Sequence, residues 1–190
     1  MNKLIAQFVT LLLFTMSTNL YSVELDPDSN TCLKVFLFKN VQNVDEIRQN
    51  VIKGLWKCAV VKPSLIMDPF QVAVAANRAV MAAKLNSMVT RTVFAEILFN
   101  LSLSKNISQS LSKFGIEKDK ELLVCFLVSP DVDTSDEIIP QIDGELCPIS
   151  ELQHMTNLQE LKKVYKINNS ESELLNIVVS KMVTKSFVAH

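Results

Sequence analysis

Residue types that commonly carry catalytic chemistry are scarce in this sequence and lie far apart. The chain has three isolated glycines, Gly54, Gly115 and Gly144. Isolated glycines do not form a phosphate-binding loop of the P-loop or dinucleotide kind, and no G-x-S-x-G string occurs. His154 lies in a polar stretch without a paired nucleophile, and His190 is the last residue. The acidic residues of 131–137 are typical of a solvated turn, so the sequence predicts no enzyme and no cofactor.

The cysteine spacing argues against a metal site. Four cysteines, Cys32, Cys58, Cys125 and Cys147, are widely spaced without a C-x-x-C pair. Zinc sites need clustered ligands, so no bound metal is expected. Cys125 lies within the apolar run LLVCFLV, where a thiol behaves as a small buried hydrophobe. We favour reduced thiols in a cytosolic protein; the alternative is a secreted protein with two disulfides.

Charge is nearly balanced overall but unevenly distributed along the chain. The formal net charge is −1, so bulk electrostatics does not recruit nucleic acid or an acidic membrane. Residues 68–114 carry an excess of Lys and Arg, whereas residues 117–151 are strongly acidic. The basic half could face phosphates. The simpler interpretation, which we favour, is that both halves are solvated faces.

The elements that must position any site are organised around an apolar helix predicted over 70–86. Asp68 has the side chain of a helix N-cap, Pro69 suits the first helical position, and Gln71 stands at the third position of a capping box. Apolar residues surround the helix on nearly all sides, which is typical of a central helix enclosed by its domain. Two further helices are predicted over 93–103 and 104–114.

Four polar residues on or beside this central helix are candidates for structure or recognition. Asn77 lies among apolar residues of the helix, so its side-chain amide needs hydrogen-bond partners within the protein. We expect it to hold neighbouring backbone in place; direct recognition is the alternative. Arg78 and Lys84 lie on two edges of the helix and Arg91 lies in the turn that follows it. These three cations are the candidates for contacts with nucleic-acid phosphates.

The remaining pattern predicts a single α+β domain. A helix is expected over 44–53, and strands or extended segments are expected in five places: 33–38, 59–67, 121–128, 144–149 and 164–167. The resulting sheet is small, mixed or antiparallel, and has about four strands, with several helices packed around the central helix.

The C-terminal helix carries more apolar surface than one core requires. Ser170 and Glu173 form a second predicted capping box. The apolar residues that follow spread over about half of the helix circumference, against the roughly 100° stripe that packing on one core needs. The candidate partner-binding residues are Leu174, Leu175, Val178, Val179 and Met182. We expect the edge with Leu175, Val179 and Met182 to contact a partner. The alternative is that the helix is buried more deeply within its own domain.

Residues 1–16 are predicted to be an extension or a signal-like segment ahead of a domain over 17–190. Lys3 followed by an apolar run resembles a signal peptide, yet the run is too short to span a bilayer. A chain that started at Met16 would lack this segment. We favour the cytoplasm and nucleus, without membrane attachment; the secretory pathway is the alternative.

Several strings resemble one protein family in the same order. They are LKVFLFKNV at 33–41, DPFQ at 68–71, AANRAV at 75–80, TRT at 90–92, EILFNLS at 96–102, ISQSLSKFGI at 107–116 and LKKVYKI at 161–167. On these residues the chain resembles the TPRKB family of PRPK-binding proteins, from residue 33 to the C-terminus. Many ordered segments make this signal more specific than a single short motif.

The resemblance implies a role that composition cannot supply. Members of this family are non-catalytic subunits of the KEOPS (EKC) complex and bind its small atypical kinase. The complex transfers a threonylcarbamoyl group to the adenosine next to the anticodon of tRNA. Archaeal relatives also bind tRNA. The resemblance therefore implies that this chain binds a kinase within the threonylcarbamoyl transferase complex, with a direct tRNA-binding module as the alternative.

Overall fold

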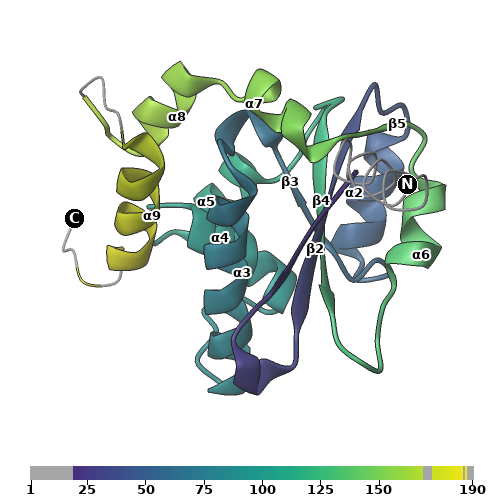
Figure 1. Cartoon of the computed structure of the whole chain (residues 1–190), viewed down its shortest axis with the longest axis horizontal. Helices are drawn as coiled ribbons and strands as arrows, with labels where there is room; N and C mark the ends of the chain where they lie inside the picture. Colours follow the sequence, from purple (N-terminus) through teal and green to yellow (C-terminus); the bar gives the residue numbers. More distant parts are fainter. Residues whose placement is uncertain (1–18, 169–172, 186, 188–190) are drawn as a thin grey trace, which may run out of the picture.

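The computed structural model describes residues 19–168, 173–185 and 187 of the chain. It is an α+β domain in which one antiparallel sheet is covered by helices on both faces (Figure 1). The fold class predicted from the sequence is therefore confirmed. Among the described residues, the sheet has five strands instead of about four, and every pairing in it is antiparallel.

The long strand β2 (Cys32–Lys39) lies at the centre of the sheet and pairs along its length with β4 (Leu122–Val128). On its other side, the first half of β2 pairs with β1 (Leu20–Glu24) and the second half with β5 (Glu145–Cys147). The short strand β3 (Ala59–Val61) pairs with the far side of β4. The first five residues of β4 are buried, as its continuous apolar run predicts.

Two layers of helices enclose the sheet (Figure 1). One face carries α2 (Val44–Ile52) and α6 (Ser135–Ile138). The other face carries the remaining helices: α3 (Pro69–Lys84), α4 (Val93–Leu101), α5 (Ile107–Phe114), α7 (Leu152–Met155), α8 (Leu158–Val164) and α9 (Leu174–Thr184). Short 3-10 turns lie at 27–29, 63–65, 139–141 and 149–151.

The central helix α3 begins where its capping residues predict. The Asp68 side chain accepts a hydrogen bond from the backbone N–H of Phe70 at 2.8 Å, and Pro69 is the first helical residue. No residue from 71 to 83 is fully exposed. The sheet, α4 and α9 therefore enclose this helix, which is the arrangement that its all-round apolar surface predicts.

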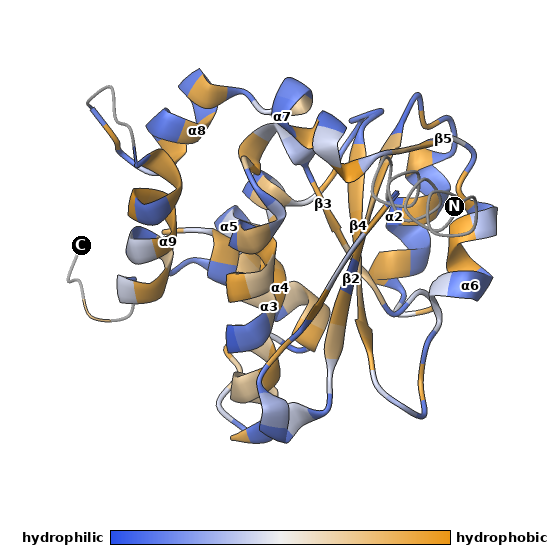
Figure 2. Ribbon diagram, in the orientation of Figure 1, coloured by the Kyte–Doolittle hydropathy of each residue, from blue (hydrophilic) through white to orange (hydrophobic). Residues whose placement is uncertain are grey.

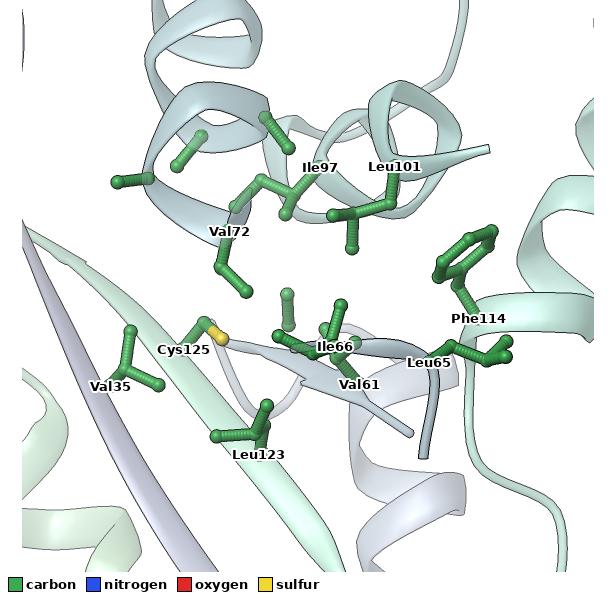
Figure 3. Packing of buried hydrophobic residues seen from close by; sticks show 14 of the residues in the cluster. Val35, Val61, Leu65, Ile66, Val72, Ile97, Leu101, Phe114, Leu123 and Cys125 are labelled. Atoms are coloured by element: carbon green, nitrogen blue, oxygen red, sulfur yellow. The ribbon is translucent and has the colours of Figure 1, made fainter. Parts of the chain in front are cut away.

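The larger core lies between the sheet and the α3–α4 pair. Val72, Ile97 and Leu101 point from the helices toward Val35 and Leu123 of the sheet (Figure 3). All five are 0% exposed. Hydrophobic residues are frequent in the strands of the sheet and in α4 (Figure 2). Burial of such side chains stabilises the fold by about 1.5–3 kcal/mol each.

A buried hydrogen-bond network closes one end of this core. The Gln71 side-chain amide nitrogen donates to the carbonyl oxygen of Leu65 at 3.1 Å and to the Tyr165 hydroxyl at 2.9 Å. Tyr165 donates to the carbonyl oxygen of Leu101 at 2.6 Å. Gln71 also accepts from the backbone N–H of Met67 at 3.2 Å. The buried side chains of Gln71 and Tyr165 thus satisfy backbone polar groups of the segment before α3 and of the last residue of α4.

Two elements differ from the sequence prediction. Residues 164–167 do not complete the sheet, because α8 ends at Val164 and Lys166 adopts a positive φ of 51°. The backbone N–H groups of Lys166 and Ile167 bond back to the last turn of α8, which terminates the helix. The strand missing from the prediction is β1. Ser170 lies outside the described residues, and Glu173 is the N-cap of α9 without a side-chain hydrogen bond.

Candidate partner-binding site on the C-terminal helix

Helix α9 packs across α3 and α4 on the face away from the sheet (Figure 1). Its residues Leu174, Val178 and Met182 follow at intervals of four and belong to the larger core, at 9%, 0% and 0% exposure. Residues at this spacing share one side of a helix. This side fixes how α9 is rotated on the domain.

Two cationic side chains fasten the C-terminal half of α9. Arg78 of α3 donates from Nη1 to the carbonyl oxygen of Met182 at 2.5 Å, and Lys185 donates from Nζ to the carbonyl oxygen of Phe99 at 2.6 Å. Desolvation by burial lowers the pKa of Arg78, an effect that the Glu96 carboxylate opposes. The pKa of Lys185 is lowered to about 8, first by desolvation and then by the charge of Arg78. The inner side of α9 is therefore a closed, structural contact.

The outer side of α9 carries a strip of apolar residues, which we call the α9 strip: Leu175, Val179 and Val183. Leu175 and Val179 are half-buried and Val183 is 40% exposed. Their spacing of four residues places them along one line of the helix. Phe187, four residues further, is 85% exposed. Apolar residues aligned on an outer helix face are typical of a surface that contacts another protein.

The structure places the residues of the predicted docking edge on two different sides of α9. Leu175 and Val179 lie on the outer side, whereas the placement of Met182 on that side is wrong, because Met182 is fully buried. Leu174 and Val178 are buried with it, so these three side chains pack in the core of the domain itself and do not form an exposed contact surface. Val183 continues the line instead. Its i+4 spacing from Val179 was the signal available in the sequence.

The three predicted nucleic-acid contacts fall in different surroundings. Arg78 is half-buried and engaged with α9. Lys84 donates to the carbonyl oxygen of Asp28 at 3.2 Å and lies 3.7 Å from its carboxylate. Arg91 is exposed. The structure therefore leaves Lys84 and Arg91 at the surface and assigns Arg78 an internal role.

Asn77 contacts backbone, the type of interaction that the sequence predicts for it. Its Oδ1 accepts a hydrogen bond from the backbone N–H of Asp26 at 2.7 Å. The 3-10 turn at 27–29 follows Asp26 directly, so this bond fastens the β1–β2 connection to α3.

The clustering of titratable residues and the state of the cysteines can be read directly from the part of the chain that the structure describes. Within it, no cluster of three or more His, Cys, Asp or Glu side chains is arranged to hold a metal ion. All four cysteines are free thiols. Burial raises the pKa of Cys58 to about 12 and also raises the pKa of Cys125, so both thiols stay protonated and unreactive. No helix within the described ranges is long and apolar enough to cross a membrane.

Comparison with known proteins identifies relatives of this chain by sequence. The family model described as kinase binding protein CGI-121 matches residues 38–186. The EKC/KEOPS complex subunit TPRKB of Danio rerio is 38% identical over 154 residues, which cover 78% of this chain and 88% of that protein. The EKC/KEOPS complex subunit CGI121 of Yarrowia lipolytica is 27% identical over 150 residues, covering 77% of this chain and 86% of its own length.

A third relative, the subunit cgi121 of Schizosaccharomyces pombe, is 26% identical over 159 residues, covering 79% of this chain and 91% of that protein. The family model spans β3, β4, β5 and every helix from α2 to α9. The chain therefore belongs to the CGI-121 family of kinase-binding proteins.

Proposed function

We propose that this chain is a non-catalytic subunit of an EKC/KEOPS complex in the cytoplasm and nucleus. It binds the small atypical kinase of that complex and thereby supports threonylcarbamoyl modification of the tRNA adenosine next to the anticodon. Relatives that are named EKC/KEOPS subunits, and that match over most of their length, support this proposal.

The α9 strip is the observation that carries the proposed contact. Leu175, Val179 and Val183 form a continuous apolar line that the domain itself leaves partly uncovered. The opposite side of α9 is locked onto α3 and α4, so the strip is held rigidly before any partner arrives. A preorganised apolar surface loses little conformational entropy on binding, which favours affinity.

The surroundings of the polar residues support a non-catalytic role. Two groups with large pKa shifts, Lys185 and Tyr165, form their hydrogen bonds with backbone and side chains inside the domain. Their pKa shifts follow first from burial. Groups engaged in this way serve packing and stability.

Co-purification of the chain with the kinase subunit tests the proposal. Val179→Asp places a carboxylate in the centre of the α9 strip, and burial of an unpaired charge in an interface costs several kcal/mol. We expect this variant to lose the kinase. Ser180→Asp is the matched control, since it adds the same charge to the exposed flank of the same helix. Both variants must retain the wild-type circular dichroism spectrum and thermal unfolding transition.

The second readout is the threonylcarbamoyladenosine content of tRNA in cells that depend on this chain. Val179→Asp should lower it and Ser180→Asp should leave it unchanged. Unaltered kinase binding by Val179→Asp would show that the α9 strip is not the kinase-binding surface. Failure of the wild-type chain to bind the kinase at all would refute the proposed function itself.

Direct contact with tRNA is the second candidate, and the exposure of Lys84 and Arg91 favours it. Binding through phosphates weakens steeply as salt concentration rises. Arg91→Glu should therefore reduce both the tRNA affinity and its salt dependence, whereas Lys118→Glu, an exposed site in the acidic half, should change neither. A wild-type chain that does not shift tRNA in an electrophoretic assay at low salt would exclude this activity for the isolated subunit.

A further inference from the structure

The end of α2 carries the most exposed pair of neighbouring aliphatic side chains in the described part of the chain. Ile52 is 71% exposed and Leu55 is 68% exposed. Single exposed apolar residues are ordinary. Here two lie three positions apart around one tight turn, and we treat them as one small surface. We call the residues of this surface the α2 patch: Arg48, Ile52, Lys53, Leu55 and Lys57.

The turn that presents Leu55 is firmly built. Gly54 adopts a φ of +72°, which costs a residue without a side chain little. The carbonyl oxygen of Asn50 accepts hydrogen bonds from the N–H groups of Leu55, at 2.9 Å, and Trp56, at 3.2 Å. The Trp56 side chain is 6% exposed and packs in the core beneath α2. Leu55 is therefore held outward between fixed neighbours.

Three cations lie close in sequence to these two aliphatic residues. Arg48 lies one helical turn before Ile52, and Lys53 and Lys57 flank Leu55 in the sequence. All three are exposed, and none makes an ion pair with a residue that the structure describes. The acidic residues of α2 are in its first turn, at the opposite end of the helix. The α2 patch is thus uniformly basic with an apolar centre.

The patch lies on the opposite side of the sheet from α9 (Figure 1). Helix α2 packs on the core that contains Phe38 and Phe126, whereas α9 packs on the core that contains Val72 and Ile97. A partner seated on the α9 strip therefore leaves the α2 patch uncovered. This geometry allows two partners at once.

We propose that the α2 patch binds an acidic segment of another protein that carries large apolar side chains. The cations pair with the carboxylates of the segment, and Ile52 and Leu55 pack against its apolar residues. Two observations favour a protein over the other anionic macromolecules. Single-stranded RNA binds by base stacking on aromatic rings, and the aromatic ring of this turn is buried. Anionic membranes are recognised by clusters of about four to eight Lys and Arg residues, more than the patch contains.

Selection from a random-peptide display library against the intact chain tests this proposal, because such a selection does not require the partner to be identified first. The selected peptides should combine Asp or Glu with Leu, Ile or Phe. The fluorescein-labelled forms of these peptides should bind about tenfold more weakly to the double variant Ile52→Ser/Leu55→Ser and to Lys53→Glu/Lys57→Glu, as measured by fluorescence anisotropy.

Leu85→Ser is the matched control, because Leu85 is a leucine with the same 68% exposure at the end of a different helix. It should bind the peptides as the wild type does. Selection of no peptide, selection of peptides without acidic residues, or equal binding by the patch variants would overturn the proposal. Preferential binding of the wild type to phosphatidylserine vesicles or to single-stranded RNA, or self-association through the patch in light scattering, would also overturn it. The Val179→Asp variant should retain peptide binding, which separates this surface from the proposed kinase contact.

Discussion

The ammonium nitrogen of Lys185 lies 3.3 Å from the centroid of the Phe99 ring and donates a hydrogen bond to the carbonyl oxygen of the same residue. Phe99 of α4 therefore stabilises the charge of Lys185 by two interactions, a cation–π contact with its ring and a hydrogen bond to its carbonyl oxygen. Lys185 is only 5% exposed. This contact, together with Arg78 bonded to Met182, fixes the orientation of α9 and hence the direction of the α9 strip.

The buried position of Lys185 predicts a rise in stability with pH. Its pKa is lowered from 10.5 to about 8 in the folded chain. Between these two values the unfolded chain holds a proton that the folded chain lacks, so the free energy of unfolding rises with pH. The buried thiols of Cys58 and Cys125 have raised pKa values and act in the opposite direction. Urea unfolding should therefore compare the free energy of unfolding of the wild type with that of Lys185→Met. The difference between the two should grow in favour of the wild type as pH rises from about 8 to 10.5. If the free energies of the two proteins change with pH in the same way, the prediction is wrong.

Tyr165→Phe tests the buried network at the end of α3. The variant keeps the ring but leaves the Leu101 carbonyl and part of the Gln71 amide without a partner. A buried polar group left unsatisfied costs about 1–3 kcal/mol, and we expect this loss in the free energy of unfolding. Tyr21→Phe, on the half-buried strand β1, is the control and should change it by less than about 0.5 kcal/mol. Equal effects of the two variants would show that the network contributes nothing.

Glu96→Gln tests the connection between α3 and α4. The Glu96 carboxylate is 3% exposed and accepts hydrogen bonds from the backbone N–H groups of Val89 and Thr90 and from the Thr90 hydroxyl. The glutamine side chain is uncharged, and its NH2 group replaces one of the two acceptor oxygens that face these N–H and O–H donors. We therefore expect a loss of about 1.5–3 kcal/mol in the free energy of unfolding.

Glu160→Gln is the control for Glu96→Gln. Glu160 pairs with Lys113 at 2.8 Å on the surface, where both side chains are more than a third exposed. Exposed ion pairs contribute little, and this variant should stay within about 0.5 kcal/mol of the wild type. If hydrogen exchange at Val89 and Thr90 is not accelerated in Glu96→Gln, the carboxylate does not organise the connection.

Asp133 predicts a loss of stability in acid. A hydrogen bond from Lys34, followed by one from Ser135, holds the pKa of Asp133 at about 2, below the usual 3.8. The stabilisation is therefore complete above about pH 4 and disappears as pH falls toward 2. The pair is partly exposed, at 26% and 29%, which limits the effect to about 1 kcal/mol. Urea unfolding near pH 5 and near pH 2.5 should show a smaller loss for Asp133→Asn than for the wild type. An equal loss would exclude this pair as a source of the acid sensitivity.

Local chemistry allowed several elements to be predicted from the sequence. Asp68 and Pro69 define the start of α3 because a cap and a fixed φ act on adjacent residues. The run from Leu122 to Phe126 is apolar enough to require burial on both faces. Strand β1 was missed because a five-residue strand is stabilised by its pairing with β2, which its own sequence does not reveal.

For the candidate site on α9, too, one part follows from the sequence and another part from the tertiary structure. The sequence of α9 determined that its apolar surface is wider than one core needs, because helical spacing follows from the order of residues alone. Only the tertiary structure decided that Met182 faces inward and Val183 outward, because the hydrogen bonds from Arg78 to Met182 and from Lys185 to Phe99 set the rotation of the helix. Those bonds join residues distant in sequence, and their geometry exists only once the helices have packed.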